Sequence, residues 1–300
     1  MNAASPTTPD AAGWRNAISF RRSSGYLALL MPLLLSGCTT SETSTNSPAA
    51  PTPMPTSILP WSSYGKLTLP VDEDGSEGAD EIPAADLVSY SSIYWFNPSP
   101  GQLSRSGYRA QGGETVFWTP VNGNGRTSES EFPRTEMREQ LDLNDDSGNW
   151  RLSGTHIQRG TVTITQLPTP TTFERDAIIT FAQMHSVNNV PPVKLQIQSS
   201  QNGTTKVFGN YNLRQREGNA VNSDIELPVV IGTKFSYEIK VVDGTVTTTI
   251  DGTMIDRRDL RPAWLFQEFY FKAGSYLGNN SATASGFGEV VYSSIQTIHQ

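Results

Sequence analysis

Three separated segments of the chain carry polar side chains of kinds that can do chemistry. They are Arg134-Thr-Glu-Met-Arg-Glu-Gln140, Ile178-Ile-Thr-Phe-Ala-Gln-Met-His185 and Tyr270-Phe-Lys-Ala-Gly-Ser-Tyr276. Guanidinium, ammonium and amide groups can hold an anion, and imidazole and phenol groups can transfer a proton. The alternative is that each segment is the solvated face of a half-buried strand. A solvated face, however, does not require Gln183 and His185 within an otherwise apolar strand.

If the segments are β-strands, side chains two residues apart share a face. The first strand then shows one face with Arg134, Glu136, Arg138 and Gln140, and another with Thr135 and Met137. The second shows one face with Phe181, Gln183 and His185, and another with Ala182 and Met184. The third aligns Tyr270, Lys272 and Tyr276, opposite Phe271 and Ala273, and Gly274 leaves room between the aligned side chains.

The rest of the chain also favours β-structure. Among 300 residues there are 25 Gly and 20 Pro, and only 17% are charged, which argues against a helical bundle. Asp243-Gly244 joins an alternating segment, 235–241, to a β-branched segment, 245–250, and this is a strong hairpin signal. No long segment shows a helical period, and short helices could occur near 84–88, 217–222 or 257–264. We expect an all-β fold, a sandwich or jelly roll of two antiparallel sheets.

These motifs resemble those of the polysaccharide lyase family 7 alginate lyases. Arg134-Thr-Glu-Met-Arg138 matches the R-[ST]-E-L-R motif, and Gln183-Met-His185 matches Q-[IV]-H except at Met184. Residues 270–276 match Y-F-K-A-G-x-Y, although Gly278 stands where Gln is usual. The resemblance extends to 66–70 and 116–121. It implies a jelly-roll β-sandwich with a long cleft on its concave sheet, acting on alginate.

The resemblance also implies roles in a β-elimination, in which the C5 proton of a uronate is removed and the C4 oxygen leaves. Arg134, Gln183 and His185 resemble the residues that neutralise the carboxylate beside C5. Tyr276 is the expected acid. On mannuronate, where proton and leaving oxygen share one side of the ring, Tyr276 could also be the base. On guluronate, where they lie on opposite sides, His185 would be the base.

Substrate binding is expected from Arg138, Lys272, Glu136 and Tyr270. Arg138 and Lys272 could bind neighbouring carboxylates of the polymer, or they could form ion pairs with Glu136 or Glu268. Glu136 lies between two arginines, so we expect an orienting partner and not a base. Tyr270 could be a stacking platform or a core residue.

The amino end has the pattern of an export signal. Three arginines, Arg15, Arg21 and Arg22, precede the apolar run Tyr26–Leu35, which is too short to cross a bilayer. The following Leu35-Ser-Gly-Cys38 resembles a bacterial lipobox, which implies lipidation of Cys38. We therefore expect a signal peptide at 1–37, a Ser/Thr/Pro-rich tether at 38–60 and a catalytic domain at 61–300. The expected location is the bacterial cell envelope, with the outer membrane favoured and the catalytic domain periplasmic or extracellular.

Several other kinds of protein are disfavoured. The net charge of −7 argues against a nucleic-acid partner, and one cysteine excludes an internal disulfide framework. The three histidines, His156, His185 and His299, show no zinc spacing, and we expect His156 at the surface and His299 in the tail. We expect no metal, no cofactor and a monomeric chain.

The sequence thus favours a lyase that cuts alginate internally and leaves 4,5-unsaturated ends. Two alternatives remain. Met184 and Gly278 keep open a lyase for another polyuronate such as glucuronan. The second alternative is a non-catalytic carbohydrate-binding lipoprotein, although binding alone does not require Gln183, His185 and Tyr276 together.

Overall fold

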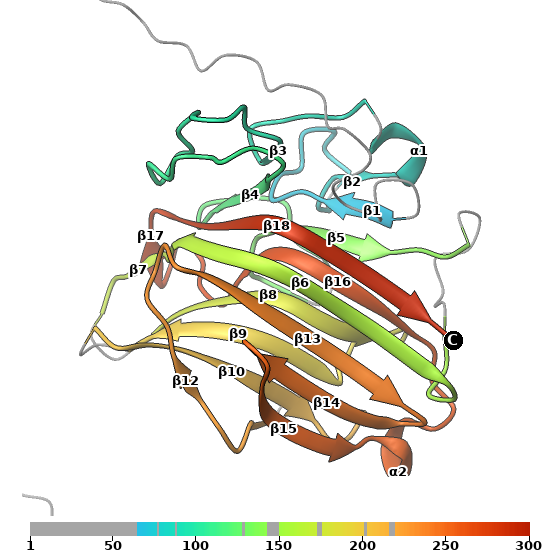
Figure 1. Ribbon diagram of the computed structural model, residues 1–300. Helices are drawn as coiled ribbons and strands as arrows, with labels where there is room; N and C mark the ends of the chain where they lie inside the picture. Colours follow the sequence, from blue (N-terminus) through green and yellow to red (C-terminus); the bar gives the residue numbers. More distant parts are fainter. Residues whose placement is uncertain are drawn as a thin grey trace, which may run out of the picture. The chain divides into compact units, whose positions relative to one another are not determined.

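The computed structural model describes residues 65–300 except 77, 88, 128–129, 143–149, 173–175, 201–202 and 216–219. All of the described residues belong to one compact unit, Pro48–Gln300. Two antiparallel sheets pack face to face in a jelly-roll sandwich, as Figure 1 shows with the seven-stranded sheet in front. The fold class inferred from the sequence is confirmed.

Each sheet draws its strands from distant parts of the chain. The larger sheet has the order β11-β10-β9-β8-β16-β5-β1-β2, with β12 also paired to β10. Its strands are β1 (Gly65–Thr68), β2 (Glu81–Ile82), β5 (Arg134–Glu139), β8 (Ala177–Ser186), β9 (Val193–Ser199), β10 (Thr205–Asn212), β11 (Ala220–Asn222), β12 (Leu227–Pro228) and β16 (Phe269–Leu277). β16 lies between β5 and β8, so the three polar segments are adjacent strands.

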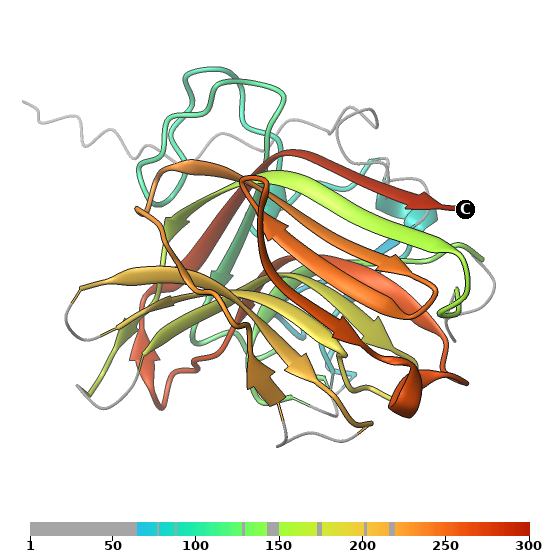
Figure 2. The same ribbon diagram turned by 60° about the horizontal axis from the view of Figure 1, so that its bottom comes forward.

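The smaller sheet has the order β15-β14-β13-β6-β18-β4-β3 and covers one face of the larger sheet (Figure 2). Its strands are β3 (Trp95–Phe96), β4 (Thr115–Pro120), β6 (Thr155–Gln166), β13 (Lys234–Val242), β14 (Thr245–Ile250), β15 (Thr253–Asp259) and β18 (Phe287–His299). A separate ribbon pairs β7 (Thr169–Pro170) with β17 (Ala284–Ser285), and two short helices are α1 (Ala84–Leu87) and α2 (Arg261–Trp264).

The hairpin turn expected from the sequence shapes the smaller sheet. Asp243 and Gly244 both have positive φ, 46° and 82°, which is the geometry of a two-residue hairpin turn between β13 and β14. Asp251 and Gly252 repeat it between β14 and β15, with φ of 47° and 75°. The hairpin prediction is therefore confirmed.

The core lies between the sheets and is rich in aromatic side chains. Phe181 of the larger sheet meets Phe235 and Tyr237 of the smaller sheet edge-on, with ring centroids 5.6 and 5.5 Å apart. Edge-to-face contacts of this kind add about 0.5–1.5 kcal/mol to the burial of each ring. Thr119 and Thr135 link the layers further, because each donates its hydroxyl to a carbonyl of the opposite sheet, at 2.8 Å.

Phe181 corrects the face assigned to it from strand alternation. It was expected to share a face with Gln183 and His185, but its side chain is fully buried in the core. The cause is a β-bulge, since the register of β8 against β9 shifts between Thr180 and Ala182. A bulge inserts one residue and reverses the alternation beyond it, so Gln183 and His185 still face away from the core.

One expected helix is replaced by a strand, a second is shorter than expected, and one histidine lies elsewhere than expected. Of the segment 217–222, residues 220–222 form β11 and the rest lies outside the described residues. The segment 257–264 divides into the end of β15 and α2, where Pro262 lies in the first turn. His156 is buried, not exposed, because it stacks on Trp150 with centroids 4.2 Å apart.

The expected signal peptide, Cys38 and the tether all lie outside the described residues. Within the described ranges, the two helices are four residues each, and none is long and apolar enough to cross a membrane.

Candidate active site

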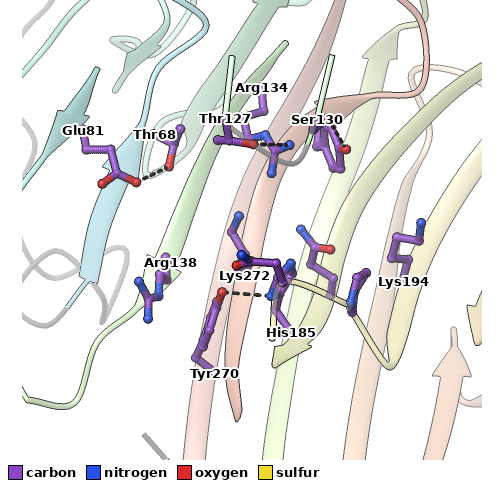
Figure 3. A pocket seen from close by; sticks show the side chains of 14 residues that line it. Thr68, Glu81, Thr127, Ser130, Arg134, Arg138, His185, Lys194, Tyr270 and Lys272 are labelled. Atoms are coloured by element: carbon purple, nitrogen blue, oxygen red, sulfur yellow. Dashed lines mark hydrogen bonds between the residues drawn. The ribbon is translucent and has the colours of Figure 1, made fainter. Parts of the chain in front are cut away.

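A polar pocket of about 170 Å³ opens on the larger sheet, on the face turned away from the core. Figure 3 shows its side chains, which come from strands distant in sequence. The lining residues are Thr68, Glu81, Thr127, Ser130, Arg134, Arg138, Gln183, His185, Asn189, Pro191, Lys194, Tyr270, Lys272 and Tyr276. The structure thus brings into one pocket all four side chains expected to be catalytic and three of the four expected to bind substrate.

Strand register explains why these side chains meet. Across β16, Lys272 lies opposite Arg138 on one side and opposite Gln183 on the other. Two residues before Lys272, Tyr270 is paired with His185 of β8. Four residues after Lys272, Tyr276 is paired with Arg134 of β5. Neighbouring strands are about 4.8 Å apart, so directly opposite side chains are within contact distance.

Gly274 lets the strands carrying these residues approach. A Cβ atom at this position would lie 2.3 Å from the carbonyl oxygen of Thr135 and 2.7 Å from the Cα of Glu136. It also lies where the register of β16 against β8 shifts, between Ala273 and Tyr276. The space left by the missing side chain of Gly274 is therefore occupied by the backbone of β5.

Glu136 lies beneath the pocket and is not one of its lining residues. Its carboxylate is 2.6 Å from Lys272 Nζ and 3.7 Å from an Arg134 nitrogen, and it accepts a hydrogen bond of 2.5 Å from Gln183 Nε2. The carboxylate therefore orients three pocket side chains at once. These contacts fit the orienting role expected from the sequence and not direct contact with a substrate in the pocket.

Lys272 forms the ion pair with Glu136 that the sequence left open, and it also lines the pocket, where its binding of a substrate carboxylate stays a prediction. Glu268, the other expected partner, instead pairs with Arg151 at 2.9 Å. Burial lowers the pKa of Lys272 below its usual value, although the charge of Glu136 opposes the shift. Glu136 is thus the group that favours the charged ammonium in the pocket.

The contact of His185 with Ser186 favours one tautomer of the ring. Nδ1 is 2.9 Å from the carbonyl oxygen of Ser186, and a carbonyl can only accept, so this contact favours a proton on Nδ1, with the Tyr270 hydroxyl, 2.8 Å away, as a second acceptor. In that tautomer Nε2 holds the lone pair that a base requires. Burial, followed by the charge of Lys272, holds the pKa of His185 well below its usual value of 6.5. The imidazole is therefore neutral at neutral pH.

Tyr270 supports this histidine from one side. Its ring stacks on His185 with centroids 5.1 Å apart, and its hydroxyl is 2.8 Å from His185 Nδ1. Arg138 lies over the Tyr270 ring, with its guanidinium carbon 4.0 Å from the centroid. Burial raises the pKa of Tyr270 to about 12, so the phenol stays neutral. Tyr270 thus lines the pocket as a largely buried ring in contact with His185 and Arg138, and its stacking on a substrate stays a prediction.

Tyr276 is held at the opposite end of the pocket by Arg134, whose guanidinium carbon is 3.9 Å from the Tyr276 ring centroid. The phenol oxygen is 2.8 Å from Ser130 Oγ. Arg134 also donates to Thr127 Oγ1 at 3.4 Å, whereas its buried Nε has no hydrogen-bond partner among the described residues. The Arg134 side chain lines the pocket beside the Tyr276 ring.

Sequence reasoning missed several lining residues. Lys194 is the clearest case, because it lies opposite Gln183 on β9. The alternation of Val193, Lys194 and Leu195 would have placed it on the polar face, but only the pairing of β9 with β8 reveals its neighbours. Thr127 and Ser130 lie shortly before β5, outside its alternating pattern, where no periodicity indicates a direction.

A cluster of carboxylates occurs away from the pocket. The oxygens of Asp72, Asp74 and Asp80 lie within 4.8 Å of one another, and such ligands suit Ca²⁺. Backbone N–H groups already bond them, from Ser76 to Asp74 at 2.8 Å and from Glu73 to Asp80 at 3.1 Å. The turn accounts for the clustering, and none of the three lines the pocket.

The family model described as alginate lyase matches residues 62–299 of the chain. The chain belongs to the alginate lyase family. This confirms the resemblance drawn from the three motifs, and it makes the protein a polysaccharide lyase.

Known relatives agree with this assignment. A curated alginate lyase from Klebsiella pneumoniae is 23% identical over 280 residues, covering 78% of this chain and 87% of that protein. Alginate lyase A1-II′ of family 7, solved with a product written GGG, is 25% identical with a TM-score of 0.67, covering 83% of this chain and 100% of that one. An alginate lyase from Pseudomonas aeruginosa is 29% identical with a TM-score of 0.63, covering 80% of this chain and 99% of that one.

Proposed function

We propose that the pocket cleaves alginate internally by β-elimination and leaves a 4,5-unsaturated sugar at the new end. The observation that carries this proposal is the meeting of His185 and Tyr276 with Arg134, Gln183 and Lys272 in one pocket. The first two can exchange protons, and the other three can hold a carboxylate. A site that only binds a polymer has no need of the first pair.

The first step is neutralisation of the carboxylate next to C5. The guanidinium of Arg134 and the amide of Gln183 line the pocket, and Gln183 keeps a second amide N–H beyond the one given to Glu136. These donors would stabilise the negative charge that develops on the carboxylate as the C5 proton leaves. A donor aimed at such charge contributes roughly 10²–10³ in rate.

The second step moves one proton off carbon and another onto oxygen. A base takes the C5 proton, the electron pair forms the C4–C5 double bond, and the C4–O bond breaks. Tyr276 protonates the leaving oxygen. The base is His185 Nε2 for guluronate and the Tyr276 phenolate for mannuronate, because the proton and the leaving oxygen lie on opposite sides of the ring in the first and on the same side in the second.

Related structures support this use of the two residue types. Alginate lyase A1-II′ was solved with a substrate written GGMG in a form with one histidine changed to asparagine and one tyrosine changed to phenylalanine. That chain is 25% identical to this one, with a TM-score of 0.66 and coverage of 83% of this chain and 98% of that one.

Glucuronan is a weaker candidate substrate. Of the two motif departures that suggested it, Met184 is fully buried in the core, and Gly278 backs onto Ile178, with its Cβ position 3.0 Å from that of Ile178. Neither is among the residues lining the pocket. These departures therefore need not alter contact with a uronate.

A substrate panel tests the proposal. The purified chain is incubated with alginate, poly-mannuronate, poly-guluronate and glucuronan while the ultraviolet absorbance of the unsaturated product is followed, and product size is read by chromatography. Early release of mixed oligosaccharides from alginate is expected. Turnover of glucuronan alone would transfer the function to that polymer, and binding without new absorbance would reduce the protein to a carbohydrate-binding lipoprotein.

We also propose that the chain acts as a monomer tethered to the bacterial envelope by a lipid on Cys38, in the outer membrane. The support is the sequence pattern alone, an apolar run followed by Leu35-Ser-Gly-Cys38 and a Ser/Thr/Pro-rich segment. Cys38→Ala should release the protein from the membrane fraction without loss of specific activity.

A further inference from the structure

Ser130 contacts the group expected to transfer protons. Its hydroxyl oxygen is 2.8 Å from the phenol oxygen of Tyr276. Ser130 lies shortly before β5, and its own N–H donates to Thr127 O at 3.0 Å. Thr127 in turn accepts a hydrogen bond from Arg134 at its Oγ1, at 3.4 Å (Figure 3). This pair of linked residues therefore contacts both Tyr276 and Arg134.

The hydrogen bonds of Ser130 limit what its hydroxyl can do. The N–H of Phe132 donates to Ser130 Oγ at 3.2 Å and so occupies one lone pair. The hydroxyl hydrogen and the second lone pair remain for Tyr276. While Tyr276 carries its proton, either hydroxyl can be the donor. Once Tyr276 is ionised, only Ser130 can donate, so the contact then stabilises a negative oxygen.

We propose that Ser130 is a positioning residue that stabilises the phenolate form of Tyr276 and thereby sets the pH range in which each type of uronate is cleaved. This inference rests on the proposed function. It adds a residue outside the three strand motifs.

The two uronates should respond to the loss of Ser130 in opposite ways. On poly-mannuronate Tyr276 must begin as the phenolate, so activity rises with pH as the phenol ionises. On poly-guluronate Tyr276 must begin as the phenol, so activity falls as it ionises. Removing the Ser130 donor makes ionisation of Tyr276 harder. The rise of activity on poly-mannuronate and the fall of activity on poly-guluronate, which we call the limbs of the two pH profiles, both move to higher pH. It lowers poly-mannuronate turnover near neutral pH and extends poly-guluronate turnover to more alkaline pH.

Other charged groups of the pocket do not explain such a shift. Those that line it or lie beneath it are Arg134, Glu136 and Arg138 from β5, His185 from β8, Lys194 from β9, Lys272 from β16 and Glu81 from β2. Ser130→Ala leaves every one of them in place. Their influence on Tyr276 is therefore common to wild type and variant and cancels in the comparison.

The test compares pH profiles of kcat for wild type, Ser130→Ala and Ser130→Thr on both polymers, with the full chain. Hydrogen bonds to charged groups are strong enough to predict that Ser130→Ala shifts each limb by about one pH unit or more. At pH values below the rise on poly-mannuronate, this shift corresponds to about a tenfold fall in kcat. Ser130→Thr keeps a hydroxyl and should restore the wild-type profile. Ser236→Ala is the matched control, because that hydroxyl is bonded to Asp251 at 3.0 Å on the other sheet.

The outcomes separate this inference from the proposed function. A wild-type chain without activity on either polymer overturns the function. An active wild type whose profile is unchanged in Ser130→Ala overturns the inference alone. A uniform loss on both polymers without a shift of either limb would also overturn it, because a purely structural role predicts that pattern. Where the wild type acts on one polymer only, the shift of the pH profile on that polymer, between wild type and Ser130→Ala, decides whether the inference holds.

Discussion

Replacing Glu136 by Gln removes the negative charge beneath the pocket while keeping the size of the side chain. Glu136 is 1% exposed and Lys272 is 6% exposed, and their charged atoms are 2.6 Å apart. In the variant the Lys272 ammonium would be buried without a counter-charge. Removing one partner of a buried ion pair costs about 3–5 kcal/mol. The amide oxygen can still accept a hydrogen bond, so we expect a loss near the lower end, ~3 kcal/mol.

Glu226→Gln is the matched control for this variant. It makes the same change in a Lys–Glu pair of nearly the same length, 2.7 Å between Lys206 Nζ and Glu226 Oε2, but with side chains 29% and 35% exposed. Exposed pairs contribute about 0–1 kcal/mol. Urea denaturation followed by circular dichroism measures both losses. If the two variants lose the same free energy of unfolding, Glu136 is not compensating a buried charge and our account of the site is wrong.

The pH dependence of the Glu136→Gln loss gives a second check. Burial already lowers the pKa of Lys272 in the folded wild type, and removal of Glu136 lowers it further. A lysine whose folded pKa lies below its unfolded value binds fewer protons when folded, so stability rises with pH through that window. The deficit of the variant should therefore shrink as the pH is raised from neutral toward 10.5, the usual lysine value. A constant deficit would contradict this reasoning.

Three further predictions concern activity. Tyr276→Phe should lower kcat by roughly 10²–10⁴-fold, the usual contribution of a positioned acid or base. Its affinity for the polymer, measured by gel electrophoresis, should be nearly unchanged. Full activity of this variant would remove Tyr276 from the mechanism. His185→Asn should impair poly-guluronate cleavage far more than poly-mannuronate cleavage. Because burial keeps the pKa of His185 well below 6.5, the acid-side fall of wild-type poly-guluronate cleavage should occur at pH values below 6.5. Lys194→Ala should raise KM for the polymer several-fold and leave kcat nearly unchanged, and a selective loss of kcat would assign it a different role.

The strand motifs could be located from sequence because strand geometry is local. A period of two decides which side chains share a face, and this was enough to separate Arg134 and Arg138 from Met137. Asp243-Gly244 fixed one hairpin because few residues tolerate positive φ at both turn positions. The meeting of the three motifs, however, depends on β16 lying between β5 and β8, and the family resemblance supplied that expectation.

What the sequence did not reveal depends on contacts between distant residues. The bulge at Phe181 turns that side chain into the core, and no local pattern marks it. Ser130 reaches Tyr276 across 146 positions of sequence. His299, expected in the tail, ends strand β18 and bonds the buried carboxylate of Glu139 at 2.8 Å, a partner that becomes apparent only when the two sheets are packed together.

The acidic character of the whole chain and its polyanionic substrate are reconciled by the arrangement of charge at the pocket. Four basic side chains line it, namely Arg134, Arg138, Lys194 and Lys272. The one carboxylate in the lining, Glu81, is bonded to Lys66 at 2.7 Å. At physiological salt, charges interact over about 8 Å, so exposed carboxylates farther away affect a bound sugar only weakly. The net charge of −7 therefore does not oppose binding within the pocket, and added salt should weaken affinity for alginate through these basic groups.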